Sequence, residues 1–213
     1  MTLERVVAGL ADKLEHRYYG KYRGIVKYND DPAGLGRLRL QVPSVLGIDV
    51  VTGWATPCAP YGGAADQGVL FVPDLEAGVW VEFEEGDLEF PIWVGTYWAK
   101  PEPGSQVPKP QQADGTESGE VQQPPTAKII RTGKGHTVQF EDKDGAESII
   151  IREGAQGHLV VLDQDGITVT DATGNSIEMT AEAMTLTAVV PFKIDAAGQP
   201  VEIVCASIDL KKG

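Results

Sequence analysis

Gly135-His136-Thr137-Val138-Gln139-Phe140 is the first of three copies of one short pattern in the second half of this chain. The other two copies are Gly157-His158-Leu159-Val160-Val161-Leu162 and Gly174-Asn175-Ser176-Ile177-Glu178-Met179. In each copy a glycine turn precedes two apolar residues that stand two positions apart, which is the period of a β-strand. Turn signals such as Asp144-Gly145 separate further short apolar runs. Residues 128–212 are therefore predicted to form a meander of short strands.

Such a meander cannot cover its own apolar side. Each strand offers only two or three apolar side chains on one face, no helical segment is predicted nearby, and an isolated ribbon of this kind is marginally stable in water. It either folds back on itself as a small sandwich or wraps with other copies around a shared core. Short, evenly spaced repeats favour the intertwined homo-oligomer. The residues expected to fill the shared core are Val138, Phe140, Val160, Leu162, Ile177, Met179, Met184 and Leu186.

Composition limits the classes of function. The chain has 213 residues, 42% of them apolar, which suits one or two domains with a core. Its net charge of -13 disfavours nucleic-acid binding through overall charge. Cys58 and Cys205 are the only cysteines, so no disulfide framework or paired-cysteine metal site is predicted, and both are expected to be buried free thiols.

No secretory signal or membrane span is predicted, because charged residues interrupt the apolar residues near the N-terminus and no run of about 18 apolar residues occurs. We therefore expect the protein to be made in the cytoplasm and carried outside by other means if it acts there. Leu3, Val6, Val7, Leu10 and Leu14 recur at helical spacing. They predict an amphipathic helix over residues 3–16.

The first half of the chain predicts a small antiparallel barrel of the OB type, because short alternating runs are separated by loops rich in Gly, Pro and Asp. The predicted strands are Tyr22–Tyr28, Gly36–Val42, Gly53–Ala59, Gly68–Val72, Gly78–Glu84 and Ile92–Trp98. After them, Lys100–Thr126 is rich in proline and poor in apolar residues, which is typical of a linker. The predicted parts are an N-terminal helical segment (1–17), an OB-fold domain (18–99), a linker (100–127) and a β-helix spike domain (128–213).

Several motifs in this order resemble the OB-fold domain of phage baseplate assembly protein V, which also occurs in the valine-glycine repeat spikes of type VI secretion. They are Tyr19-Gly20-Lys21-Tyr22-Arg23-Gly24-Ile25-Val26, Asp31-Pro32, Gly36-Arg37-Leu38-Arg39-Leu40-Gln41-Val42-Pro43, Trp54-Ala55-Thr56-Pro57-Cys58-Ala59-Pro60-Tyr61, Gly78-Val79-Trp80-Val81-Glu82-Phe83-Glu84-Glu85-Gly86-Asp87 and Pro91-Ile92-Trp93-Val94-Gly95. The repeats that begin at Gly135 resemble the triple-stranded β-helix that follows this domain in such spikes.

The resemblance implies an all-β homotrimer: an OB-fold barrel followed by an intertwined β-helix, or β-prism, that forms a needle. It also implies a central spike of a contractile injection system or phage tail, which docks on a baseplate hub and punctures the target envelope by mechanical contact. Some relatives carry a lysozyme domain between these parts, but residues 99–127 are too few for one. The C-terminus lacks the iron-binding His-x-His pair of some phage spikes, so a tip protein of the PAAR type is expected to dock on Ile208, Leu210, Lys211 and Lys212.

Three chemical hypotheses compete with this structural role. Glu82 and Glu84 share a strand face at a spacing that inverting glycosidases use, but a solvated strand face is favoured because the sequence indicates neither a cleft nor a carboxyl group with a raised pKa. Asp142-Lys143-Asp144-Gly145 and Asp163-Gln164-Asp165-Gly166 begin like calcium loops but lack the later ligands, so hairpin turns are favoured. His136 and His158 could form rings on a threefold axis, but surface positions after a turn are favoured.

The main alternative is an OB-fold module that binds oligosaccharide or single-stranded nucleic acid. Cationic side chains interleave with tyrosines in the first strands: Lys21, Arg23, Lys27, Arg37 and Arg39 with Tyr18, Tyr19, Tyr22 and Tyr28. Acidic residues from Glu82 onward are expected to neutralise them, which favours ion pairs or a docking surface for the hub. No enzymatic activity, cofactor or metal site is predicted.

Overall fold

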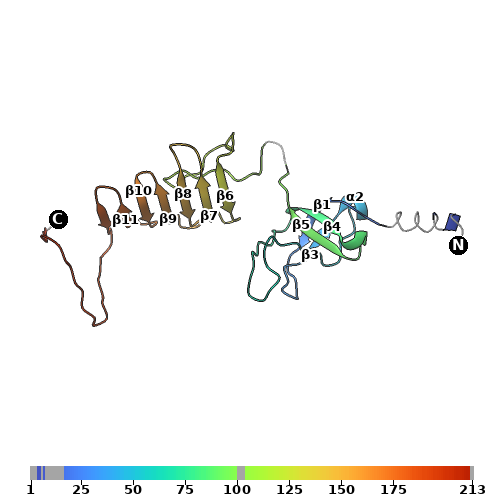
Figure 1. Ribbon diagram of the computed structural model, residues 1–213, viewed down its shortest axis with the longest axis horizontal. Coiled ribbons are helices and arrows are strands. Elements are labelled where there is room, and N and C mark those ends of the chain that lie inside the picture. The colour runs from blue at the N-terminus through green and yellow to red at the C-terminus, as the bar shows by residue number, and fades with distance from the viewer. Residues whose placement is uncertain (1–3, 6, 8–16, 100–103, 212–213) are drawn as a thin grey trace. The chain divides into compact units, whose positions relative to one another are not determined.

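The chain forms two compact units that divide between Gln106 and Val107 (Figure 1). The structure is a computed structural model, which describes Glu4, Arg5, Val7 and residues 17–99 and 104–211. Most of the helix predicted for residues 3–16 lies outside the described residues, although Glu4, Arg5 and Val7 are helical. Nearly all other regular structure is β-strand, so the predicted all-β class is confirmed.

The first unit contains a five-stranded sheet in the order β2-β1-β4-β5-β3. Its strands are β1 (Tyr22–Tyr28), β2 (Arg39–Gln41), β3 (Thr56–Pro57), β4 (Gly78–Phe83) and β5 (Pro91–Thr96). A bridge between Leu38 and Ala55 links the residues beside β2 to those beside β3, so the two outer strands of the sheet are connected. The short helices are α2 (Pro43–Leu46) and the 3-10 turn η1 (Glu84–Gly86).

Alternation along β4 builds the core of this unit. Val79, Val81 and Phe83 point inward, and the intervening residues are only partly buried. On β1, Gly24 lies so close to β4 that a Cβ atom there would be 2.7 Å from Cγ2 of Val81. Any larger residue at position 24 would therefore clash with the side chain of Val81, which would have to shift. The buried cluster consists of Val26, Leu38, Leu40, Val42, Ala55, Val79, Val81, Phe83 and Trp93.

Asp31 organises the loop between β1 and β2. Its carboxylate accepts hydrogen bonds from the backbone N–H groups of Ala33, Leu35 and Arg37, and from Nη2 (2.6 Å) and Nε (3.0 Å) of Arg37. The bond from the Arg37 side chain is the main reason why the pKa of Asp31 lies well below its usual range. Asp31-Pro32 and Gly36-Arg37, which belong to two separate sequence motifs, therefore stabilise the same loop.

Two predictions for the first unit are wrong. Gly68–Val72 does not form a strand, because this segment closes a loop in which Val69 N–H donates to the carbonyl of Tyr61 (3.1 Å) and no ladder partner is present among the described residues. Leu70 and Phe71 are consequently exposed. Cys58, and Cys205 in the second unit, are free but exposed rather than buried.

The second unit is a seven-stranded antiparallel meander in which each strand pairs with the next in sequence (Figure 1). The strands are β6 (Ala127–Arg131), β7 (Thr137–Glu141), β8 (Ser148–Arg152), β9 (Leu159–Asp163), β10 (Gly166–Thr170), β11 (Ser176–Met179) and β12 (Met184–Thr187). The predicted meander is thus confirmed as far as Thr187. The described chain by itself is a single sheet and not a closed prism.

The three sequence repeats correspond to three equivalent turns along one edge of the sheet. Gly135, Gly157 and Gly174 have φ angles of 83°, 89° and 97°, a left-handed conformation that glycine adopts readily. The residue after each glycine accepts a hydrogen bond from a backbone N–H at the next connection along that edge. His136 Nδ1 accepts from Gly154 (3.1 Å), His158 Nδ1 from Ala172 (3.2 Å) and Asn175 Oδ1 from Val189 (2.9 Å).

Residues 188–211 contain no strand, so the meander predicted for residues 128–212 ends at Thr187. Within this segment Gln199 N–H donates to the carbonyl of Ala196 (2.9 Å), which makes a turn between two extended arms that follow β12 in Figure 1. A strand is stable only when its backbone groups are paired. The arms lack such pairing in the described part of a single chain.

Candidate assembly surface

One face of the second sheet carries two continuous rows of apolar side chains. The strand register places them directly opposite one another from each strand to the next. The first row is Ile130, Val138, Ile151, Val160, Val169, Ile177 and Leu186. The second row, which begins with Lys128 on β6, continues through Phe140, Ile149, Leu162, Ile167, Met179 and Met184. We call this surface the apolar face.

The apolar face is not covered by the chain that forms it. Phe140 is 44% exposed and Met184 is 72% exposed, and every residue of β12 is exposed. A contiguous apolar surface of this extent is typical of a protein interaction site in a soluble protein. The opposite face differs sharply, because Thr137, Gln139 and Ile150 are almost completely buried there.

All eight residues predicted to fill a shared core lie on the apolar face, four in each row. Sequence reasoning missed the apolar members contributed by β6, β8 and β10, namely Ile130, Ile149, Ile151, Ile167 and Val169. The alternation of Ile167 and Val169 with threonines on β10 was a usable signal, whereas the unbroken run Ile149-Ile150-Ile151 on β8 does not show which side chains share a face.

A hollow of about 270 Å³ marks the C-terminal end of the apolar face. Val169, Ile177 and Leu186 line it from the first row, and Val190 and Phe192 line it from the segment after β12. The apolar surface therefore continues beyond the last strand of the sheet.

Comparison with known families gives two matches. A family model described as the injector OB domain of type VI secretion systems and phage baseplates matches residues 22–98. A model described as the C-terminal trimerisation domain of phage baseplate V matches residues 128–188, the range that contains both rows of the apolar face. The chain belongs to the phage baseplate V family. No curated protein matches the chain.

A phage baseplate V protein is a structural component of a baseplate spike, and both matched domains are structural. Its second domain is a trimerisation domain, which supports a homotrimer and agrees with an apolar face that one copy leaves open. No helix among the described residues is long and apolar enough to cross a membrane.

The residues expected to receive a tip protein lie near the C-terminus. Ile208 and Leu210 are exposed, and Lys211 forms an ion pair with Asp209 (Nζ–Oδ2 3.0 Å). Lys212 lies outside the described residues. These side chains are accessible in a single copy of this baseplate protein, and their role in tip docking stays a prediction.

The two carboxylates considered for hydrolysis do not share a cleft. Glu82 on β4 forms an ion pair with Lys21, and Glu84 begins η1, so the strand alternation ends at Phe83. The shallow pocket beside Glu84 is lined by Arg17, Glu84, Glu85, Asp87 and Phe90 and does not include Glu82. A general acid and base need a common substrate position, which this arrangement does not provide.

The histidines and the aspartate-rich turns have local structural roles. Nδ1 of His136 and of His158 is occupied by a backbone N–H, which leaves only Nε2 of each ring free. Asp163 Oδ1 accepts from the N–H groups of Asp165 and Gly166 at the hairpin between β9 and β10. Among residues 17–99 and 104–211, no group of three or more His, Cys, Asp or Glu side chains is arranged to hold a metal ion.

Each cation of the predicted nucleic-acid patch has a partner within the OB unit. Lysines and arginines bind carboxylates in three cases: Lys21 with Glu82, Lys27 with Glu76 and Arg37 with Asp31. The other two stack on aromatic rings: Arg23 on Trp80 and Tyr97, and Arg39 on Tyr28. Nucleic-acid binding through this surface would require the loss of these contacts.

Proposed function

We propose that this protein is the central spike of a contractile injection system or phage tail, assembled as a trimer around the apolar faces of its second domain. The observation that carries the proposal is the pair of in-register apolar rows that a single copy leaves uncovered. Three copies related by an axis parallel to the stacking direction of the strands would turn all three apolar faces toward one core. Such a ring closes on itself and buries the rows.

The dimensions of the sheet suit a needle. Seven strands at a spacing of about 4.8 Å give a stack roughly 29 Å long from β6 to β12. Antiparallel pairing satisfies the backbone groups along this stack, and a continuous apolar core would resist compression because packed interiors have low compressibility. In this proposal the second domain is an intertwined β-helix, or β-prism, that transmits force when a sheath contracts.

In this proposal the OB domain and residues 208–212 each bind a different partner. The OB domain docks on a baseplate hub protein, and residues 208–212 receive a PAAR-type tip protein that leads the needle into the target envelope. Contact with the membrane is mechanical in this proposal, and no catalysis is needed. The protein would be made in the cytoplasm, built into a particle and act at the target envelope.

Light scattering coupled to size-exclusion chromatography tests the proposal on the full chain. We expect a trimer at micromolar concentration that persists on dilution. A well-folded monomer under these conditions would refute the spike. For the alternative function as an OB-fold binding module, filter binding and a glycan array at physiological salt are expected to show no specific ligand.

A further inference from the structure

The segment between the two matched domains packs on the sheet. Gln139 on β7 points away from the apolar face, and its Oε1 accepts the backbone N–H of Gln111 (2.7 Å). Its Nε2 donates to the carbonyl of Gln111 (2.9 Å), so the side-chain amide pairs with both backbone groups of one residue. Gln139 is 2% exposed, and Gln111 is also buried. A residue of the predicted linker is thus bound to the centre of a strand.

Further contacts hold this segment along the first strands of the sheet. Glu117 forms an ion pair with Arg131 at the end of β6. Gln122 donates to the carboxylate of Glu141 on β7 (3.0 Å) and accepts the backbone N–H of Ala127 (2.7 Å). A Cβ atom at Gly115 would be 3.5 Å from the side chain of Leu159, which places this part of the segment beside β9.

The composition of the covered face changes where these contacts stop. In register, the central residues of β7 to β12 on this face are Gln139, Ile150, Val161, Thr168, Glu178 and Thr185. Ile150 is 1% exposed, and Val161 is also buried. On β10 to β12 the corresponding positions are polar. The strands carry large apolar side chains on this face only at β6 to β9, where the segment makes its contacts.

We propose that residues 107–122 are a clasp that makes the sheet one-sided, so that only the apolar face is available to other copies of the chain. Without the clasp, Ile150 and Val161 would form a second exposed apolar surface, and sheets with two such surfaces can stack in more than one way. The clasp does not create the trimer in this account. It excludes competing assemblies, which goes beyond the proposed function as a spike.

The test replaces residues 107–122 of the full chain with a Gly/Ser sequence of equal length. We expect the discrete trimer to give way to larger and heterogeneous assemblies in light scattering, with increased binding of the apolar dye ANS. A second variant adds Ile150→Thr and Val161→Thr, which copies the polar character that Thr168 already gives this face. We expect this second variant to return to a discrete trimer.

The variant with the two added threonines distinguishes two roles of the clasp: covering a second apolar surface, and stabilising the sheet. If the clasp only stabilised the sheet, the two threonine substitutions would not restore the trimer, and the proposal would be overturned. It would also be overturned if the Gly/Ser variant stayed a discrete trimer. A wild-type chain that is not trimeric would instead contradict the spike, so the two failures are distinguishable.

Single substitutions provide a milder test with a matched control. Gln139→Ala removes both bonds to Gln111, whereas Gln112→Ala changes a neighbouring exposed side chain of the clasp. We expect Gln139→Ala to speed hydrogen exchange at the Gln111 amide by at least about tenfold, and Gln112→Ala to leave it unchanged. Equal exchange in both variants would show that Gln139 does not hold the clasp.

Discussion

The substitution Val169→Asp tests the assembly surface most directly. Val169 lies on β10 between Val160 and Ile177 in the first apolar row and is 38% exposed in a single copy. Full burial of a valine contributes about 1.5–3 kcal/mol, so covering its remaining surface contributes about 1 kcal/mol for each copy. An ionised carboxylate in the core adds a desolvation cost of at least about 3 kcal/mol per ion.

Three copies of the substitution meet in one trimer, so the penalties add to roughly 12 kcal/mol. At about 1.4 kcal/mol for each factor of ten, the association constant of the trimer should fall by eight or more orders of magnitude. The change in the single copy is smaller because position 169 is partly exposed there. We expect a folded sheet that no longer associates, detected as a monomer by analytical ultracentrifugation at micromolar concentration.

Thr168→Asp is the matched control, because Thr168 is the neighbour of Val169 on the same strand and lies on the opposite face. We expect this variant to remain a trimer, as Glu178 is already tolerated on that face. Acid should partly restore the Val169→Asp trimer, because burial raises the pKa of a carboxyl group and its neutral form costs less to bury. A trimer of Val169→Asp at neutral pH would refute the assignment of the apolar face.

Three further predictions concern single side chains. His158→Ala removes the acceptor for Ala172 N–H and should lower the free energy of unfolding by about 1 kcal/mol. His158→Asn should retain most of that stability, because Asn175 makes the equivalent bond in the third repeat. Equal losses of stability in a denaturant titration of the two variants would contradict this role. The pKa of Asp31 is lower in the folded state than in the unfolded chain, so the stability from its pair with Arg37 is complete above about pH 4 and is lost at more acid pH. Asp31→Asn should therefore weaken the fall in the free energy of unfolding below about pH 4. An unchanged fall would show that Asp31 does not cause it. Gln111 Oε1 is buried without a hydrogen-bond partner among the described residues. Gln111→Leu should therefore stabilise the protein by about 1 kcal/mol. A lower melting temperature of this variant would show that the oxygen has a hydrogen-bond donor in the assembly.

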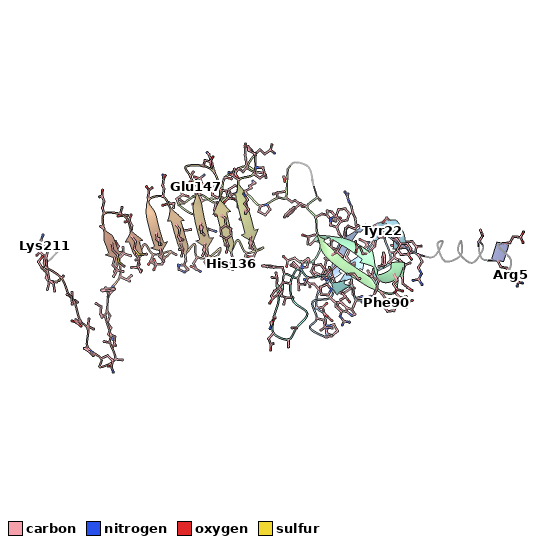
Figure 2. The ribbon with its side chains drawn as sticks, in the orientation of Figure 1. Arg5, Tyr22, Phe90, His136, Glu147 and Lys211 are labelled. Atoms are coloured by element: carbon pink, nitrogen blue, oxygen red, sulfur yellow. The ribbon has the colours of Figure 1, made fainter. Side chains whose placement is uncertain are left out.

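The asymmetry of the sheet explains why its domain needs other copies. Side chains alternate along every strand, so one register fixes which residues share a face. Here the register collects Val138, Val160 and Ile177 with their neighbours on one side and Gln139 and Thr168 on the other. Figure 2 shows His136 and Glu147 at opposite ends of the strands of this sheet, where the turns reverse the chain. No described residue of the same chain covers the middle of the apolar face.

The sequence alone determined the features that depend on local spacing. Alternation of apolar residues after Gly135, Gly157 and Gly174, and again at Met184 and Leu186, predicted four strands of the second unit and the eight core candidates, all of which share one face. The same reasoning predicted the strands at Tyr22–Tyr28 and Gly78–Glu84 of the OB barrel, because turn residues and period-two patterns act within a few residues of the chain.

Only the tertiary structure decided the features that depend on distant partners. Gly68–Val72 has the composition of a strand but pairs with no other strand, and residues 107–122 have the composition of a linker but pack on β7. The polar residue Gln139 is buried because it pairs with Gln111, which is 28 residues away in sequence. A local pattern records which side chains prefer burial. Which segment covers them is decided by hydrogen bonds and packing between residues that the sequence places far apart.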